Sequence, residues 1–141
     1  MNINNTTLKF FLSTAKFQTK LGRRLDASLN GISLNELIIL HHLNQAQDQK
    51  MRRIDLADKI GLTASGVTRL LLPMEKIGLI KKEANENDAR VSYVLLATGG
   101  KIKLEEGVER LEIFSEDLIP QDKIKELDNI TKLLNELEKN I

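Results

Sequence analysis

The sequence of 141 residues contains no cysteine and no tryptophan, and it has only two prolines, one tyrosine and four phenylalanines. The lack of cysteine excludes a disulfide scaffold, a cysteine-ligated zinc or iron–sulfur site, and a thiol-based redox switch. No apolar run reaches the length of about 18 residues that a membrane-spanning helix needs, and polar residues interrupt the first residues too early for a secretory signal. We therefore expect a soluble, cytoplasmic protein without a membrane partner.

Motifs of the common enzyme classes are also missing. The sequence has no nucleophile elbow, P-loop, dinucleotide-binding fingerprint or HExxH motif. His41 and His42 are adjacent, so on a helix their side chains would point about 100° apart and would not form a paired metal site. We expect a protein that is not an enzyme and that holds neither a cofactor nor a metal ion.

The net charge of +1 conceals an uneven distribution. Residues 49–103 hold 11 basic and 6 acidic side chains, whereas residues 104–141 hold 5 basic and 11 acidic ones. Such segregation favours one face suited to a polyanion. A chance excess of basic side chains on a solvated surface explains the counts equally well.

The apolar spacing predicts a mainly α fold with a small antiparallel β hairpin in one domain. Ser33 and Glu36 form a predicted capping box at the start of the second helix. Pro73 lacks an N–H group and should kink the fourth helix or restart it there. The first helix has two apolar strips, one for its own core and one for a partner chain or a ligand cavity. Helices are expected over residues 5–29, 34–45, 54–60 and 64–76, then strands over 79–84 and 91–96, then two more helices.

Residues 53–96 contain the layout of a winged helix-turn-helix. Ala57 is small where two helices must cross closely, Gly61 allows the turn between them, and Val67 falls in the buried seam. The predicted hairpin with a charged tip follows directly and forms the wing.

The start of the second helix of this motif is suited to DNA because its side chains are short. Short side chains let a helix tip approach base edges and phosphates, and Arg69 lies where it could reach either of them. The alternative for each residue is a helix cap or a surface side chain paired with an acid. The candidate DNA-binding residues of this helix are Thr63, Ala64, Ser65, Thr68 and Arg69.

The hairpin adds Lys81 and Lys82 on its first strand and Arg90 near its tip. A projecting arginine suits the narrow, electronegative minor groove. Asp88 can accept a hydrogen bond from the Arg90 guanidinium or from the loop backbone and so hold the wing in shape. The alternative is a hairpin closed by a local ion pair of little energetic weight.

Together these residues resemble the MarR family of bacterial and archaeal transcriptional regulators. The resemblance covers the whole chain in layout and is specific over residues 52–100. It rests on the stretch Arg52–Leu70 and on three motifs, which are Val67-Thr68-Arg69-Leu70, Glu75 followed by Gly78-Leu79-Ile80, and Asp88 with Arg90.

The resemblance implies a homodimer that binds a pseudo-palindromic operator in double-stranded DNA, most often as a repressor. Residues 1–30 and 101–141 would form the helical dimerisation region, and residues 31–100 the winged helix-turn-helix, with Arg90 in the minor groove. Ala97 departs from the family pattern, which often has a capping threonine there. Pro73 departs as well, because it could bend the second half of the recognition helix away from DNA.

Many members of this family release DNA when a small aromatic or phenolic effector binds between the dimer helices and the winged domain. The residues here that would line such a site are Phe10, Phe17, His41 and His42. A different function also fits the sequence: a helical dimer of the same fold that acts as a protein-binding adaptor or antirepressor and has lost its affinity for DNA.

Overall fold

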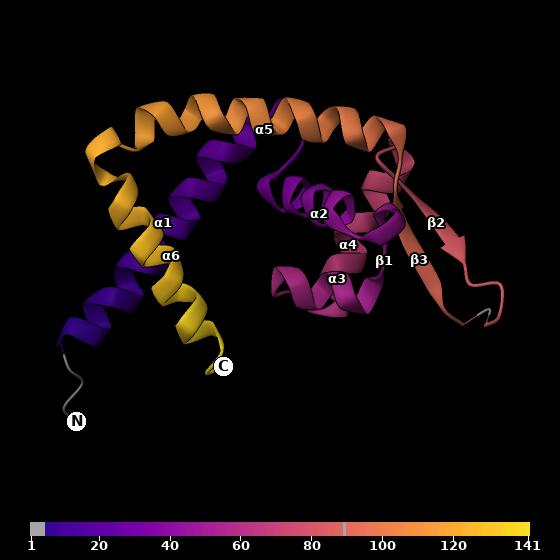
Figure 1. Ribbon diagram of the computed structural model, residues 1–141, viewed down its shortest axis with the longest axis horizontal. Coiled ribbons are helices and arrows are strands. Elements are labelled where there is room, and N and C mark those ends of the chain that lie inside the picture. The colour runs from indigo at the N-terminus through magenta and orange to yellow at the C-terminus, as the bar shows by residue number, and fades with distance from the viewer. Residues whose placement is uncertain (1–4, 89) are drawn as a thin grey trace.

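The computed structural model describes residues 5–88 and 90–141. Figure 1 shows a long helix, α5, lying across one side of a helical body, with a three-stranded sheet at one end. This arrangement confirms the predicted mainly α fold with an antiparallel wing. The elements, in order, are α1 (Asn5–Ser28), α2 (Leu34–Gln45), the 3-10 turn η1 (Gln47–Gln49), β1 (Lys50–Arg52), α3 (Arg53–Ile60), α4 (Ala64–Lys76), β2 (Ile80–Ala84), β3 (Ser92–Leu96), α5 (Thr98–Leu118), the 3-10 turn η2 (Gln121–Lys123) and α6 (Ile124–Glu138).

The start of α2 is fixed by side chains, as its sequence predicts. The Ser33 hydroxyl accepts a hydrogen bond from the Glu36 amide at 3.1 Å, and the Glu36 carboxylate accepts one from the Ser33 amide at 2.9 Å. Asp26 of α1 accepts a further bond from the Leu34 amide at 2.7 Å. These bonds satisfy N–H groups that a helix start otherwise leaves unpaired and tie α2 to α1.

One strand was not foreseen. β1 joins the predicted hairpin as a third strand, and the sheet order is β1-β3-β2 with both pairings antiparallel. Its three residues are too few to show a strand pattern, and it follows Asp48 and Gln49, which both have positive φ angles. The strand exists because β3 pairs with it, placing Arg52 opposite Tyr93. It thereby anchors the wing to the start of α3.

Pro73 does not restart α4, so of the two effects that the sequence predicts there, a kink or a restart, the restart is wrong. The helix runs from Ala64 through Pro73 to Lys76. Proline has no N–H to donate to the carbonyl four residues earlier. Val67, Leu71 and Met74 are buried on both sides of this position, so packing of the apolar face holds the helix together across the missing bond.

The core lies around α2. Ile39, Leu40 and Leu43 have no exposed surface, and α2 packs against α1, α3, α4 and α5 as well as against the sheet. Leu25 and Leu104 bring the ends of α1 and α5 into the same core cluster. The winged part and the adjoining ends of the long helices therefore form one packed body.

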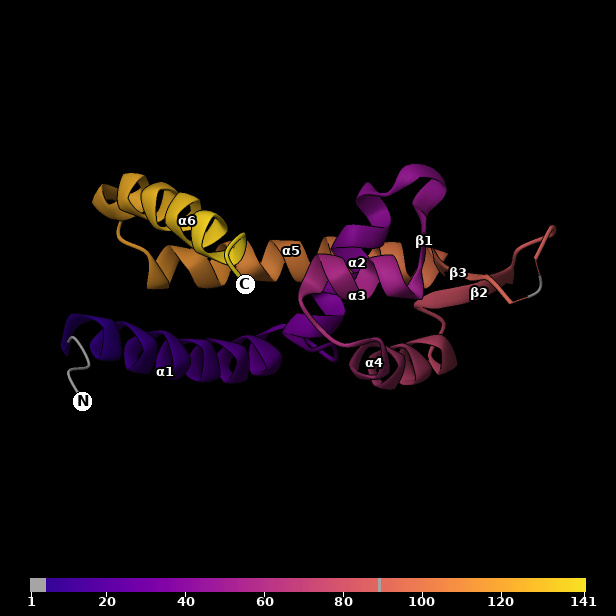
Figure 2. The ribbon, with the colours of Figure 1, turned by 90° about the horizontal axis from the view of Figure 1, so that it is seen from below.

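Two helical arms extend from this body with their apolar side chains uncovered. Figure 2 shows α1 and α6 on the side away from the wing, separated from each other. Every residue from 5 to 20 is exposed, and no residue of α6 is buried. The apolar residues left in solvent on these arms include Leu8, Phe11, Leu12, Phe17, Ile124, Ile130, Leu134 and Leu137.

Among the described residues, no helix combines the length and apolar character needed to cross a membrane.

Candidate nucleic-acid interface

The turn between α3 and α4 has the geometry of a helix-turn-helix. Gly61 has a φ of +73°, a left-handed conformation that glycine adopts without steric cost. The Leu62 amide then donates to the Ala57 carbonyl at 3.0 Å and closes the turn. Ala57 and Val67 are buried where the two helices cross, which confirms the roles that their spacing predicts.

The first residues of α4 form a capped, solvent-exposed helix tip. The Thr63 hydroxyl accepts a hydrogen bond from the Gly66 amide at 3.1 Å and lies 3.3 Å from the Ser65 hydroxyl. A Cβ on residue 66 would come within 3.2 Å of the Thr63 hydroxyl oxygen, so this cap explains the glycine. Thr63, Ala64 and Ser65 are exposed, so these short side chains remain accessible to a ligand.

Thr68 uses its hydroxyl within the protein. The hydroxyl donates to the Ala64 carbonyl at 3.0 Å and accepts a hydrogen bond from Nη1 of Arg53 at 3.0 Å. Because a hydroxyl has one proton, Thr68 cannot donate to a nucleic acid while the bond to Ala64 persists. Arg69 is exposed on the same helix and has no ion-pair partner within residues 5–88 and 90–141.

The tip of the wing is held by Asp88, as the sequence predicts. Its carboxylate accepts hydrogen bonds from the backbone amide of Arg90 at 3.0 Å and from Nε of Arg90 at 3.2 Å. These two bonds, the backbone bond first, lower the pKa of Asp88. The Arg90 side chain is 91% exposed, so it is oriented by Asp88 and still projects into solvent. Ala89, between them, lies outside the described residues.

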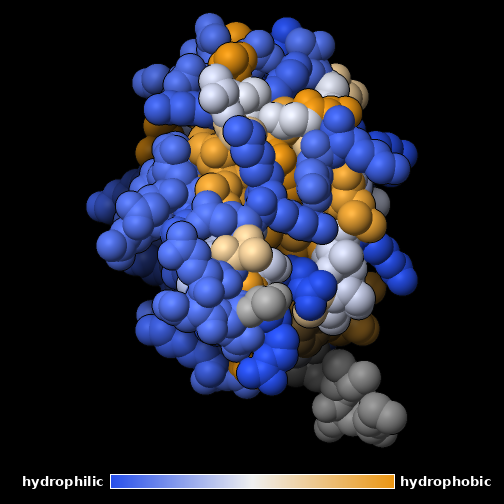
Figure 3. Space-filling view, turned by 90° about the vertical axis from the view of Figure 1, so that its right-hand side faces the viewer, coloured by the Kyte–Doolittle hydropathy of each residue, from blue (hydrophilic) through white to orange (hydrophobic). Residues whose placement is uncertain are grey.

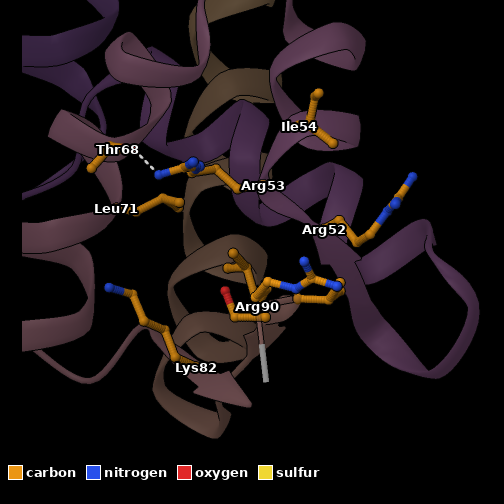
Figure 4. A pocket seen from close by; sticks show the side chains of 10 residues that line it. Arg52, Arg53, Ile54, Thr68, Leu71, Lys82 and Arg90 are labelled. Atoms are coloured by element: carbon orange, nitrogen blue, oxygen red, sulfur yellow. Dashed lines mark hydrogen bonds between the residues drawn. The ribbon is translucent and has the colours of Figure 1, made fainter. Parts of the chain in front are cut away.

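A groove of about 290 Å³ lies between the start of α3, the helix α4 and the wing. Figure 4 shows Arg53 and Thr68 of the two helices on one side of this groove and Lys82 and Arg90 of the wing on the other. The structure thus brings together Thr68, Lys82 and Arg90 of the predicted residues. The cationic side chains that line it are Arg52, Arg53, Lys82 and Arg90.

Arg52 and Arg53 were not among the predicted site residues. They occur in the motif that carries the family resemblance, but their place in the groove depends on β1, which the sequence does not reveal. Arg52 donates to Asp55 at 2.9 Å, and this hydrogen bond with the charge of Asp55 raises the pKa of the guanidinium. Lys82 is 3.4 Å from the carboxylate of Glu75.

Lys81 and Lys82 do not share a surface. Successive side chains of a strand point to opposite faces, so Lys81 lies on the side of β2 away from the groove that Lys82 lines. Seen from the wing end, the surface is largely hydrophilic, with smaller apolar areas between the charged side chains (Figure 3). This end of the molecule therefore differs from the apolar arms.

The four residues considered for an effector do not all meet within one chain, although the ring centroids of His41 and His42 lie 5.3 Å apart. His41 lines a groove between α2 and α5 with Asn44 and Leu104, whereas Phe10 and Phe17 are exposed on the free part of α1. His42 is half-buried, and burial is the main cause that lowers its pKa, followed by the charges of His41 and Lys59. A shared effector site would require a second chain over α1.

Comparison with known proteins finds a family model that matches the winged part. Residues 32–92 match the model of the MarR family. The chain is 28% identical over 107 residues to the HTH-type transcriptional repressor YetL of Bacillus subtilis, a match that covers 74% of this chain and 64% of YetL. The HTH-type transcriptional regulator YdgJ of the same organism is 25% identical over 111 residues, covering 79% of this chain and 66% of YdgJ. The chain thus spans just under two thirds of the length of these curated relatives.

Solved structures share the whole fold. The transcriptional regulator BldR from Sulfolobus solfataricus superimposes with a TM-score of 0.84 at 21% identity, and the match covers 100% of both chains. Sco3205 of Streptomyces coelicolor, a MarR family transcriptional regulator solved in complex with DNA, gives a TM-score of 0.78 at 20% identity, covering 96% of this chain and 89% of that one. At these identities the likeness establishes the common fold.

Proposed function

We propose that this chain is a member of the MarR family and a sequence-specific DNA-binding transcriptional regulator that acts as a homodimer. The observation that carries the proposal is the groove in which α3, α4 and the wing present four cationic side chains together. The exposed tip of α4 belongs to the same helix as Thr68 and Leu71, which line the groove. No catalytic step is part of the proposed function.

Each part of this surface suits a different feature of a duplex. The short side chains at the start of α4 allow the helix tip to enter the major groove, where Arg69 can contact base edges. Arg90 projects from the wing as a minor-groove contact requires, with Asp88 fixing its direction. The positive charge between them attracts the phosphate backbone.

The exposed arms support the homodimer. The apolar side chains of α1 and α6 are uncovered in the single chain, and a contiguous exposed apolar surface marks an interaction site. A second copy would cover these arms and place two winged parts on one duplex, as a pseudo-palindromic operator requires. YetL is named a transcriptional repressor, and a dimer of the present chain would repress by covering its operator.

We also propose that the dimer has an effector site for a small aromatic or phenolic compound beside Phe10, Phe17, His41 and His42. The support is limited to the exposed aromatic side chains of α1 and to the groove that His41 lines. Binding there would couple the arms to the winged part, because α5 packs against both α1 and α2.

Titration of duplex binding with salt tests the proposed function. We expect the logarithm of the affinity to fall linearly with the logarithm of salt concentration, with a slope of several units, because phosphate contacts release counterions. The Arg90→Ala variant should bind all sequences more weakly, by about 1.5–3 kcal/mol. The Arg69→Ala variant should also relax sequence preference, by about 1–3 kcal/mol at one base pair.

The control is Lys101→Ala, which removes one exposed positive charge at the start of α5, outside the groove. This variant should bind like the wild type. A wild-type protein whose binding does not respond to salt, or that binds no duplex, would instead favour the protein-binding adaptor. Unchanged footprints for Arg69→Ala and Arg90→Ala would remove the roles assigned to these residues.

A further inference from the structure

The four cations of the groove differ in how their charges are balanced. Arg52 is paired with Asp55 at 2.9 Å, Lys82 with Glu75 at 3.4 Å, and Arg90 with Asp88 at 3.2 Å. Arg53 is the exception, because no carboxylate within residues 5–88 and 90–141 lies within ion-pair distance of it. Its charge is therefore available to an anion that enters the groove.

Arg53 is also held in position. Its Nη1 donates to the Thr68 hydroxyl at 3.0 Å, across the gap between α3 and α4 (Figure 4). The Thr68 hydroxyl is itself fixed, because it donates its proton to the Ala64 carbonyl at 3.0 Å. A guanidinium has five N–H donors on a planar fork, so one bond to Thr68 orients the fork and leaves other donors for a ligand.

We propose that Arg53 binds one phosphate of the DNA backbone between the recognition helix and the wing, and that Thr68 is the positioning residue that orients its guanidinium. This inference rests on the proposed DNA-binding function. A phosphate matches the observed site because a guanidinium fork binds phosphate oxygens in a bidentate manner. An uncompensated cation that is already oriented also loses less side-chain entropy on binding.

The assignment changes the role of Thr68. The sequence suggests that its short side chain touches DNA directly, whereas its hydroxyl proton is committed to Ala64 and one of its acceptor positions to Arg53. Thr68 then acts on DNA through Arg53. Substitutions of Arg53 should therefore remove a phosphate contact, whereas substitutions of Thr68 should only disturb the orientation of that contact.

The test measures salt-dependent binding of the full chain to an operator duplex. Arg53→Ala should lower the slope of log affinity against log salt by about one unit and weaken binding by about 10- to 100-fold. Arg53→Lys keeps the charge but lacks the fork, so it should keep the slope and recover part of the affinity. Lys101→Ala should change neither quantity.

The Thr68 variants separate positioning from charge. Thr68→Val removes the acceptor for Arg53 and should weaken binding a few-fold without changing the slope, because the positive charge remains. Thr68→Ser keeps the hydroxyl and should bind like the wild type. Equal binding by Thr68→Val and Thr68→Ser would overturn the positioning role.

A neutral methylphosphonate moved along the operator locates the phosphate itself. At one position in each half-site the modification should weaken binding by the wild type. Arg53→Ala should bind the duplex modified at that position as well as it binds the unmodified duplex. If Arg53→Ala loses further affinity at every position, or if its salt slope equals that of the wild type, Arg53 does not bind a backbone phosphate.

Free inorganic phosphate, compared with chloride at equal ionic strength, distinguishes a free anion from DNA. No extra competition is expected, and strong competition that Arg53→Ala abolishes would make a free anion the ligand and overturn the assignment. Thermal unfolding of each variant checks folding. If the wild type binds no duplex, the proposed function is refuted. If the wild type binds DNA but the Arg53 variants bind equally well, only the role of Arg53 is refuted.

Discussion

A Leu134→Asp variant is expected to be monomeric and to lose operator binding. Leu134 lies on α6, is 45% exposed in the single chain and shares an apolar strip with Leu127, Ile130 and Leu137. In the proposed dimer the new carboxylate would be buried without a partner, at a cost of about 3–5 kcal/mol. Each monomer would then hold only one half-site, so operator binding should weaken together with dimerisation.

Sedimentation velocity and operator binding by the same samples measure both effects. Asn135→Asp is the matched control, because it adds the same charge to the next residue of α6, off this strip. That variant should remain dimeric and bind the operator. A Leu134→Asp protein that sediments as the wild type does, and binds with wild-type affinity, would show that α6 does not form the dimer contact.

A Gly100→Ala variant is expected to be destabilised by about 3 kcal/mol, the upper part of the range for overpacked sites. Gly100 is buried in the first turn of α5, and a Cβ there would overlap the Leu79 carbonyl oxygen and come within 2.9 Å of Cδ1 of Leu96. The same carbonyl accepts a hydrogen bond from the Ala97 amide at 3.1 Å. The Leu79 carbonyl is part of the backbone and cannot move aside as the end of a side chain can. The start of α5 must therefore shift away from Leu79.

Chemical denaturation of Gly100→Ala, with Gly22→Ala as control, measures this effect. No atom lies within 4 Å of a Cβ added to Gly22 on α1, and alanine favours a helix over glycine by about 1 kcal/mol. The control should be as stable as the wild type or slightly more stable. Equal stability of Gly100→Ala and the wild type would contradict the close contact between α5 and Leu79.

Sequence reasoning succeeded where a structural feature depends on neighbours in the chain. Ser33 and Glu36 fix the start of α2 from three residues apart, and Asp88 holds Arg90 from two residues away. The sequence also predicts that Ala97 cannot cap the next helix, and α5 begins there without a side-chain hydrogen bond. Such features can be predicted because the partners are fixed by local geometry.

The sequence does not predict features that depend on contacts between residues far apart in the chain. β1 is too short to show a strand pattern in the sequence. It forms because it pairs with β3, whose partner residues lie more than 40 positions later in the chain. The link between Arg53 and Thr68 spans 15 residues and exists only because α3 packs on α4. Pro73 is tolerated for a similar reason, because the buried residues on either side of it hold α4 against the core.

The central claim is that two copies of the chain bind one operator. It is tested most directly by selecting genomic DNA fragments with the purified protein and then counting the chains on each bound duplex. The account predicts enriched fragments with an inverted repeat, half-sites separated by about one helical turn (about 10 bp), and two chains on each duplex. Selection that enriches no fragment, or complexes with one chain on an asymmetric site, would contradict it.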